Sequence, residues 1–246
     1  MKKSLNFSLA FCAALLFVEP AMTQKRQSRP IARKTTQATP PKKVVNPNRE
    51  VILTPTPSPT PQPTPTAEPF ATASIEKMSA QCVILETEAG AIELKMLPET
   101  APETVRNFLN TVASGAYDTT TFSRVVKNFV VQGGNLSTRP EITPDIAARS
   151  RRTIMDEPNP IKHVRGIVSM ARPDTAHGAT TNFFILVSNA AHLDGTFAAF
   201  ARVTNGMEVA DAINGAVVEG DKPVVPVRLK RAVLSSCPVK PNEPTN

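Results

Sequence analysis

The sequence has 246 residues, three cysteines and a formal net charge of +7. Residues 1–75 hold 10 of the 28 Lys and Arg but only 3 of the 21 Asp and Glu, which leaves 18 basic and 18 acidic residues in the rest. Because the excess charge lies in the N-terminal part and the chain has one tyrosine and no tryptophan, we predict that nucleic acid is not a partner. The length allows one domain with appendages.

The first 23 residues are typical of a secretory signal peptide. Two lysines precede an apolar stretch over residues 5–18, which is shorter than the ~20 residues that span a bilayer. We predict cleavage near Thr23 and export to the periplasm, the cell envelope or the exterior, with no membrane span afterwards. Two alternatives stay open. In the first, the segment is not cleaved and anchors the chain in a membrane. In the second, Cys12 carries a lipid.

Residues 24–75 are predicted to be a disordered linker. Its first half is basic, and proline occupies every second position between residues 55 and 65. Alternating prolines favour a semi-rigid polyproline II spacer, and the segment has too few large apolar residues to form a core. The basic half, residues 25–49, is either a solvated linker or a contact for anionic envelope polymers and lipid headgroups.

A folded domain is predicted over residues 76–240, followed by a tail over 241–246. Apolar residues alternate with polar ones over 82–88 and 91–96 on either side of Gly90, which predicts a β-hairpin. Thr100 and Glu103 form a capping-box pattern around Pro102. The following apolar residues have helical spacing and predict an amphipathic helix that ends at Gly115: Val105, Phe108, Leu109 and Val112.

Residues 122–134 read FSRVVKNFVVQGG, a β-branched and aromatic run that ends in two glycines. Arg124 is costly to bury inside such a run, so it either reaches solvent as an ion-paired strand residue or faces a cleft. The second alternative would make it a functional residue. Composition alone does not decide between the two.

The rest of the domain is predicted to be mainly β. Residues 135–155 are polar and are interpreted as a long surface loop, and three short apolar runs follow over 166–171, 182–187 and 197–203. A turn at 194–195, a second helix over 207–215 and a last strand over 224–234 complete the chain. Many short strands with two helices indicate a closed or nearly closed β-barrel.

Several kinds of chemistry have no support in the sequence. The three histidines lack metal-ligand spacing, and the sequence has neither a glycine-rich phosphate loop nor a Gly-x-Ser-x-Gly motif. We therefore predict a site without metal or cofactor, built from an apolar pocket and hydrogen bonds.

Four blocks, in order, resemble the cyclophilin family of peptidyl-prolyl isomerases. FSRVVKNFVVQGG is similar to the family's FHRVxxxFxxQGG, and GIVSMA at 166–171 matches its G-x-[LIV]-[SA]-M-A. TNFFI at 181–185 resembles SQFFI, and residues 193–195 resemble LDG. The resemblance covers about 155 residues, from Cys82 to Ser236. It implies a closed eight-stranded antiparallel β-barrel capped by two α-helices, and we expect a monomer that acts on proline-containing polypeptides.

The resemblance also implies the site. Arg124 takes the place of the catalytic arginine, and the substrate-binding positions are Phe129, Val130, Gln132, Ala171, Arg172, Asn182, Phe184, His192, Leu193 and Phe197. Phe129, Phe184 and Leu193 correspond to the proline pocket. Gln132 corresponds to the glutamine that binds the substrate backbone, and the backbone at 171–172 corresponds to the segment that pairs with the peptide.

Five positions depart from the family pattern. Ser123 replaces a histidine, Val130 a methionine, Asn182 a glutamine and Phe197 a histidine. His192 stands where cyclosporin-sensitive members carry tryptophan, so we predict weak cyclosporin binding.

Loss of the signal would leave Cys82 and Cys237, either as a disulfide or as two free thiols. Because the family pairs its first and last strands antiparallel, the resemblance favours the disulfide. The predicted function is an exported peptidyl-prolyl isomerase that assists the folding of exported proteins. Two alternatives are a peptide-binding scaffold without useful turnover and a basic tail that attaches the domain to the envelope.

Overall fold

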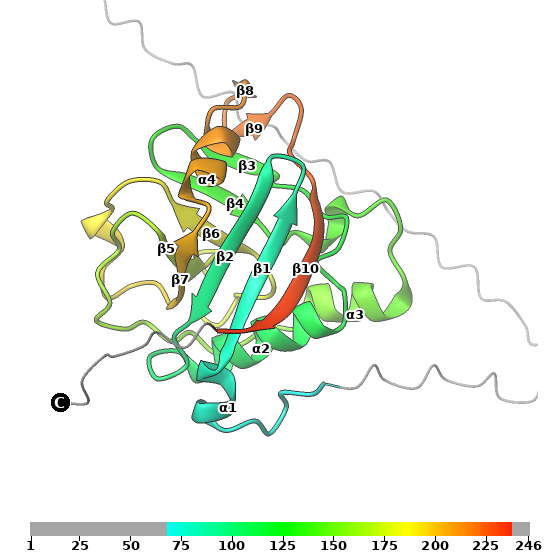
Figure 1. Cartoon of the computed structure of the whole chain (residues 1–246), viewed down its shortest axis with the longest axis vertical. Helices are drawn as coiled ribbons and strands as arrows, with labels where there is room; N and C mark the ends of the chain where they lie inside the picture. Colours follow the sequence, from blue (N-terminus) through cyan, green and yellow to red (C-terminus); the bar gives the residue numbers. More distant parts are fainter. Residues whose placement is uncertain (1–67, 238–246) are drawn as a thin grey trace, which may run out of the picture. The chain divides into compact units, whose positions relative to one another are not determined.

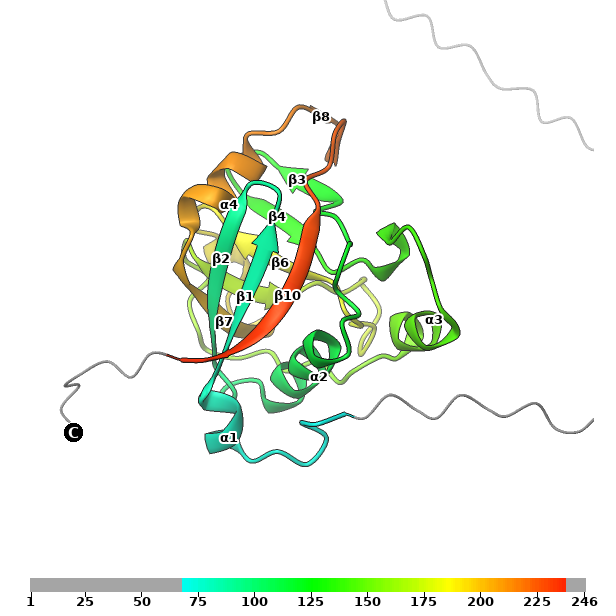
Figure 2. The ribbon, with the colours of Figure 1, turned by 45° about the vertical axis from the view of Figure 1, so that its right-hand side comes forward.

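The computed structural model describes residues 68–237, and its framework is a strongly curled sheet of eight antiparallel strands (Figures 1 and 2). The strands are neighbours in the order β10-β1-β2-β7-β5-β6-β4-β3, which confirms the predicted eight-stranded antiparallel architecture. Their bounds are β1 (Gln81–Thr87), β2 (Gly90–Met96), β3 (Arg124–Val126), β4 (Val130–Gly133), β5 (Ile167–Met170), β6 (Phe183–Leu186), β7 (Ala199–Asn205) and β10 (Leu229–Ser236). The predicted signal peptide, most of the linker and the C-terminal tail lie outside the described residues.

The edges of the sheet meet through the segment that precedes β3. The Phe122 amide donates to the Val227 carbonyl at 2.9 Å, and the Leu229 amide donates to the Thr120 carbonyl at 2.8 Å. These bonds satisfy backbone groups that an open sheet edge would leave unpaired. The curled sheet is thus closed by a short backbone seam between residues 120–122 and 227–229.

The β1–β2 hairpin is confirmed as predicted. Its strands pair from Thr87↔Gly90 to Cys82↔Lys95, and the alternating residues Ile92, Leu94 and Met96 are buried. Gly90 has a φ of +132°, and a Cβ placed there would lie 2.7 Å from the Val209 side chain. Glycine is therefore needed at this turn for its backbone conformation and for close packing.

The amphipathic helix is confirmed as α2 (Pro102–Ala113), and its four predicted apolar residues are buried. Phe108 lies in an aromatic cluster, with ring centroids 4.9 Å from Phe200 and 5.3 Å from Tyr117. The Tyr117 hydroxyl donates to the Thr181 carbonyl at 2.8 Å. Burial raises the pKa of Tyr117, so the phenol remains protonated as a donor inside the core.

The capping-box prediction for this helix is wrong. Ala101 occupies the N-cap without a side-chain bond, and the Thr100 hydroxyl donates instead to the Leu97 carbonyl at 3.0 Å. The cap comes from Glu157, whose carboxylate accepts from the Glu103 amide at 3.1 Å and from the Thr104 amide at 2.7 Å. A carboxylate at this end also opposes the positive end of the helix dipole.

The surface-loop prediction for 135–155 is wrong in part. The segment contains the 3₁₀ turn η1 (Leu136–Thr138) and the helix α3 (Pro144–Arg151). Thr143 caps α3 by accepting from the Ile146 amide at 3.4 Å, and Pro144 occupies the first turn. The periodic signal is absent because Ile146 is the only residue of α3 that is buried.

The end of the domain also differs from the prediction. Helix α4 (Met207–Asn214) is confirmed, but β10 starts at Leu229 rather than at residue 224. The residues before it form a small hairpin of β8 (Val218–Glu219) and β9 (Lys222–Pro223). With α1 (Ile75–Ser79) and α3, the described part of the chain has four α-helices rather than the two predicted.

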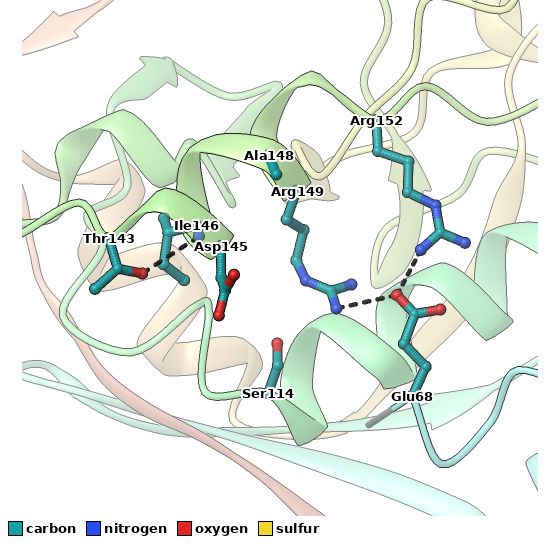
Figure 3. Close-up of a pocket in the computed structure, with 8 residues that line it drawn as sticks. All are labelled: Glu68, Ser114, Thr143, Asp145, Ile146, Ala148, Arg149 and Arg152. Carbon is teal, nitrogen blue, oxygen red and sulfur yellow. Dashed lines mark hydrogen bonds and ion pairs between the residues drawn. The ribbon is translucent and has the colours of Figure 1, made fainter. Parts of the chain in front are cut away.

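Residues 68–75, assigned to the linker by sequence, pack against the domain. Phe70 is 4% exposed, and its amide donates to Asn110 Oδ1 at 2.9 Å. Figure 3 shows the guanidinium groups of Arg149 and Arg152 reaching the Glu68 carboxylate, and both donate to its Oε1. Residues 68–75 are therefore part of the folded structure.

Cys82 and Cys237 are joined by a disulfide, with their Cα atoms 4.9 Å apart. The pairing of β1 with β10 places them there, because Cys82 lies opposite Ser235 and the Cys237 amide donates to the Ala80 carbonyl at 3.1 Å. The bond closes a loop across a sequence separation of 155 residues.

Replacing Glu157 by alanine is expected to lower the free energy of unfolding by about 1–2 kcal/mol, since it removes the acceptor of two helix-terminal amides. Glu103→Ala is the matched control. The Glu103 carboxylate is itself exposed and in the described structure accepts only from Arg106 Nε, so a change within about 0.5 kcal/mol is expected. Urea unfolding checks both variants, and a larger loss for Glu103→Ala would contradict the long-range cap.

Opening the disulfide is expected to cost about 2–5 kcal/mol, because a long loop regains conformational freedom in the unfolded chain. The measurement is urea unfolding of the wild type and of the Cys82→Ala/Cys237→Ala double variant, each with and without dithiothreitol. The reductant should destabilise the wild type and leave the double variant unchanged. An equal response of both proteins would show that the bond does not stabilise the fold.

Candidate active site

The β3–β4 hairpin places Arg124 on the outer face of the sheet. Arg124 pairs with Gln132, and Val125 pairs with Val131. Since successive strand residues point to opposite faces, the two valines enter the main core while Arg124 and Gln132 face outward. The strand geometry therefore keeps the Arg124 side chain out of the main core.

A second apolar cluster lies on the same outer face. Adjacent residues of β6 point to opposite faces of the sheet, since Phe183 belongs to the main core and Phe184 to the outer cluster. Val130 and Leu193 also belong to the outer cluster, and Phe197 packs against it.

This outer cluster forms the floor and walls of a cavity of about 160 Å³. Nine of the eleven predicted site residues line it: Arg124, Phe129, Val130, Gln132, Ala171, Arg172, Phe184, Leu193 and Phe197. The other two lie beside these residues without lining the cavity. The Asn182 carbonyl accepts from the Ala171 amide at 2.9 Å, and the His192 ring centroid is 5.4 Å from that of Phe129.

Aromatic contacts fix the cavity walls. The Phe184 and Phe197 rings meet edge to face with centroids 5.8 Å apart. The Arg172 guanidinium carbon lies 5.2 Å from the Phe197 ring centroid, which is within cation–π range. These rings therefore enclose an apolar space with cationic groups at its border.

A charged partner of Arg124 was not found from the sequence. Asp221 Oδ2 accepts from Arg124 Nε at 3.1 Å and from Nη2 at 2.9 Å. Asp221 lies in the turn between β8 and β9, and 97 residues separate it from Arg124. The turn residues Gly220-Asp221 are a local signal for a bend, but nothing in the sequence relates them to Arg124.

The segment that carries Leu193 is held by a buried histidine. The His163 amide donates to Asp194 Oδ1 at 2.7 Å, and His163 Nδ1 lies 3.3 Å from the same oxygen. His163 Nε2 lies 2.9 Å from Ser169 Oγ, so the neutral ring can donate through Nδ1 and accept from the hydroxyl. Burial lowers the pKa of His163, although Asp194 opposes that shift.

Another cavity, of about 280 Å³, lies away from this site between α3 and the N-terminal segment (Figure 3). Its two arginines, Arg149 and Arg152, already pair with Glu68. Among residues 68–237, no group of three or more His, Cys, Asp or Glu is arranged to hold a metal ion. In the same range no helix is long and apolar enough to cross a membrane. The outer-face cavity beside Arg124 is therefore the candidate site.

Comparison with known proteins agrees with this geometry. The family "cyclophilin type peptidyl-prolyl cis-trans isomerase/CLD" matches residues 82–234. Peptidyl-prolyl cis-trans isomerase cyp18 of Streptomyces antibioticus is 39% identical over 167 residues, which cover 62% of this chain and 97% of that protein. Peptidyl-prolyl cis-trans isomerase A of Dickeya dadantii is 37% identical over 164 residues, which cover 64% of this chain and 83% of that protein.

A solved cyclophilin type isomerase of Cryptosporidium parvum has a TM-score of 0.57 at 27% identity, and the match covers 64% of this chain and 99% of that one. A second structure of that protein, determined in the presence of the dipeptide Ala-Pro, has a TM-score of 0.56 at 28% identity and covers 63% of this chain and 99% of that one.

Stability is expected to fall as the pH drops below about 6.5, the ordinary pKa of histidine. Because the pKa of His163 is lowered in the fold, the unfolded chain binds a proton first and acid favours unfolding. A single group contributes a slope of at most about 1.4 kcal/mol per pH unit.

The measurement is urea unfolding between pH 7.5 and 4.5. The slope below pH 6.5 should decrease in His163→Gln and persist in His177→Gln, whose side chain is 56% exposed. An unchanged slope in His163→Gln would contradict this assignment.

Proposed function

The chain belongs to the cyclophilin-type peptidyl-prolyl cis-trans isomerases, and from this membership we propose that the cavity beside Arg124 isomerises Xaa-Pro bonds of exported proteins as they fold. The observation that carries the proposal is the position of an outward-facing guanidinium at the edge of an apolar, aromatic-walled cavity. Both features are needed for this reaction, and a single hairpin supplies the guanidinium and part of the wall.

The reaction needs few chemical groups, but these groups must be held in a specific geometry. Rotation about an Xaa-Pro bond faces a barrier of roughly 18–20 kcal/mol, because amide resonance is lost in the twisted state. The prolyl nitrogen then becomes pyramidal and gains a lone pair. A donor placed at that nitrogen binds the twisted state more strongly than either planar isomer, which lowers the barrier. Arg124 is the proposed donor.

The cavity is proposed to hold the proline ring while the preceding carbonyl rotates. Phe129, Phe184 and Leu193 offer an apolar surface of the size that a ring can fill. Gln132 is proposed to bind the substrate backbone, and the backbone at Ala171 and Arg172 is proposed to pair with the peptide. The mechanism involves no covalent intermediate and no proton transfer.

The proposal also includes export of the protein from the cytoplasm. Two features support it: the signal-like first 23 residues, and the Cys82–Cys237 disulfide, since such bonds persist mainly in oxidising compartments. In the exported state the substrates would be proline-containing chains that fold outside the cytoplasm.

Arg124→Ala is expected to lower kcat/KM by about 100-fold, the typical cost of removing a donor that acts on the transition state. Arg231→Ala is the control, because Arg231 is an exposed β10 residue that pairs with Glu86 and does not line the cavity. Exchange of a Xaa-Pro peptide measured by NMR checks both. Wild-type activity in Arg124→Ala would refute the site, and peptide binding by the wild type without acceleration would favour a scaffold role.

Full-length protein expressed in a bacterium is expected outside the cytoplasm, with its N-terminus near residue 24 and without free thiols. Cell fractionation, intact-mass measurement and alkylation of unreduced protein test these three points. An uncleaved chain in the membrane fraction would instead support the anchored alternative, and a cytoplasmic chain with free thiols would refute export while leaving the isomerase site untouched.

A further inference from the structure

The guanidinium of Arg124 is held at one edge by a carboxylate from a distant part of the chain. Asp221 Oδ2 accepts from Nε at 3.1 Å and from Nη2 at 2.9 Å. The side chains of Arg124 and Asp221 are 44% and 51% exposed, so the pair lies at the surface beside the cavity.

The backbone of Asp221 is fixed beside the same strand. Its carbonyl accepts from the Val125 amide at 2.8 Å, one residue after Arg124. The hairpin that carries it pairs Val218 with Pro223, and Pro223 is buried. Gly220, with a φ of +62°, makes the turn immediately before Asp221. The carboxylate is therefore presented to Arg124 from a backbone that is itself bonded to β3.

We propose that Asp221 is a positioning residue for the isomerase reaction, an inference that rests on the proposed role of Arg124. An exposed arginine side chain samples many rotamers, and a donor must meet the prolyl nitrogen in one orientation. Asp221 occupies Nε and one Nη2 hydrogen, which leaves Nη1 and the other Nη2 hydrogen for the substrate. The bond thereby selects the rotamer in which the free donors border the cavity.

If Asp221 only stabilised the fold, its loss would lower the melting temperature and would not selectively lower kcat. Exposed ion pairs contribute little to folding, so loss of the Asp221 carboxylate should hardly change the melting temperature. The substrate ring is held by the apolar walls rather than by Asp221, so binding of the planar substrate should also change little. The expected signature is therefore a loss in kcat at nearly constant KM.

The experiment measures kcat and KM by NMR exchange on an uncharged, end-blocked Xaa-Pro peptide with Asp221→Asn and Asp221→Ala. We expect kcat to fall about 3- to 10-fold with KM within about 2-fold, the signature of an interaction made only in the transition state. Asp221→Glu should recover part of the loss, since it keeps the carboxylate.

The matched control is Asp211→Asn. It breaks an equally exposed pair, Arg165–Asp211, whose side chains are 42% and 49% exposed and which does not line the cavity. This variant should keep the wild-type kcat. Unchanged kcat in both Asp221→Asn and Asp221→Ala would overturn the proposal, as would an equal loss in Asp211→Asn.

Salt provides a second test, whose main readout is the kcat of the wild type. Raising NaCl from 0.1 M to 1 M shortens the screening length from about 10 Å to about 3 Å and weakens exposed pairs. Wild-type kcat should fall toward that of Asp221→Asn, whose kcat should stay constant; if wild-type kcat does not fall, the proposal is refuted.

Arg124→Ala measured in parallel distinguishes failure of the proposed site from failure of this inference. If it is fully active, the proposed site itself is wrong, whereas an inactive Arg124→Ala beside fully active Asp221 variants refutes only this inference.

Discussion

The antiparallel register of β3 and β4 is the constraint on which both the core and the candidate site depend. Val125 lies opposite Val131 on the inner face, and Arg124 lies opposite Gln132 on the outer face. A slip by one residue would exchange the two sets, placing a guanidinium in the core and valines at the cavity. The register is therefore specified by burial, and the close packing of the core fixes the backbone positions from which the outward-facing side chains project.

Sequence patterns were sufficient for elements with a regular apolar spacing over a short stretch of the chain. The alternation around Gly90 gave the β1–β2 hairpin, and the helical spacing from Val105 to Val112 gave α2. The grouping around the cavity was inferred in another way, from ordered motif blocks that resemble a known family. Periodicity alone left two alternatives for Arg124, an ion-paired strand residue in solvent or a residue facing a cleft. A strand pattern does not show which face of the sheet is covered.

Two of the errors, the cap of α2 and the start of the fold, depend on partners far away in sequence. Glu157 caps α2 from 53 residues away, and the Thr100 hydroxyl is occupied by the Leu97 carbonyl instead of a helix amide. Glu68 joins the fold because two arginines of the α3 region reach it. Charged surface side chains have no regular spacing in the sequence. Their ion-pair partners can therefore be identified only when the fold is known. For α3 a local signal was present in Thr143-Pro144, but its single buried residue gave no apolar stripe.

The segment between β8 and β10 connects closure of the sheet with the chemistry of the site. Its Val227 carbonyl accepts from Phe122, just before β3, and its Asp221 carbonyl accepts from Val125 within β3, so two backbone bonds flank Arg124. The same segment leads into β10, which pairs with β1 and ends beside the disulfide. One connection therefore supplies both a carbonyl that closes the seam and the carboxylate that pairs with Arg124, although Asp221 lies 97 residues away from Arg124 in the sequence.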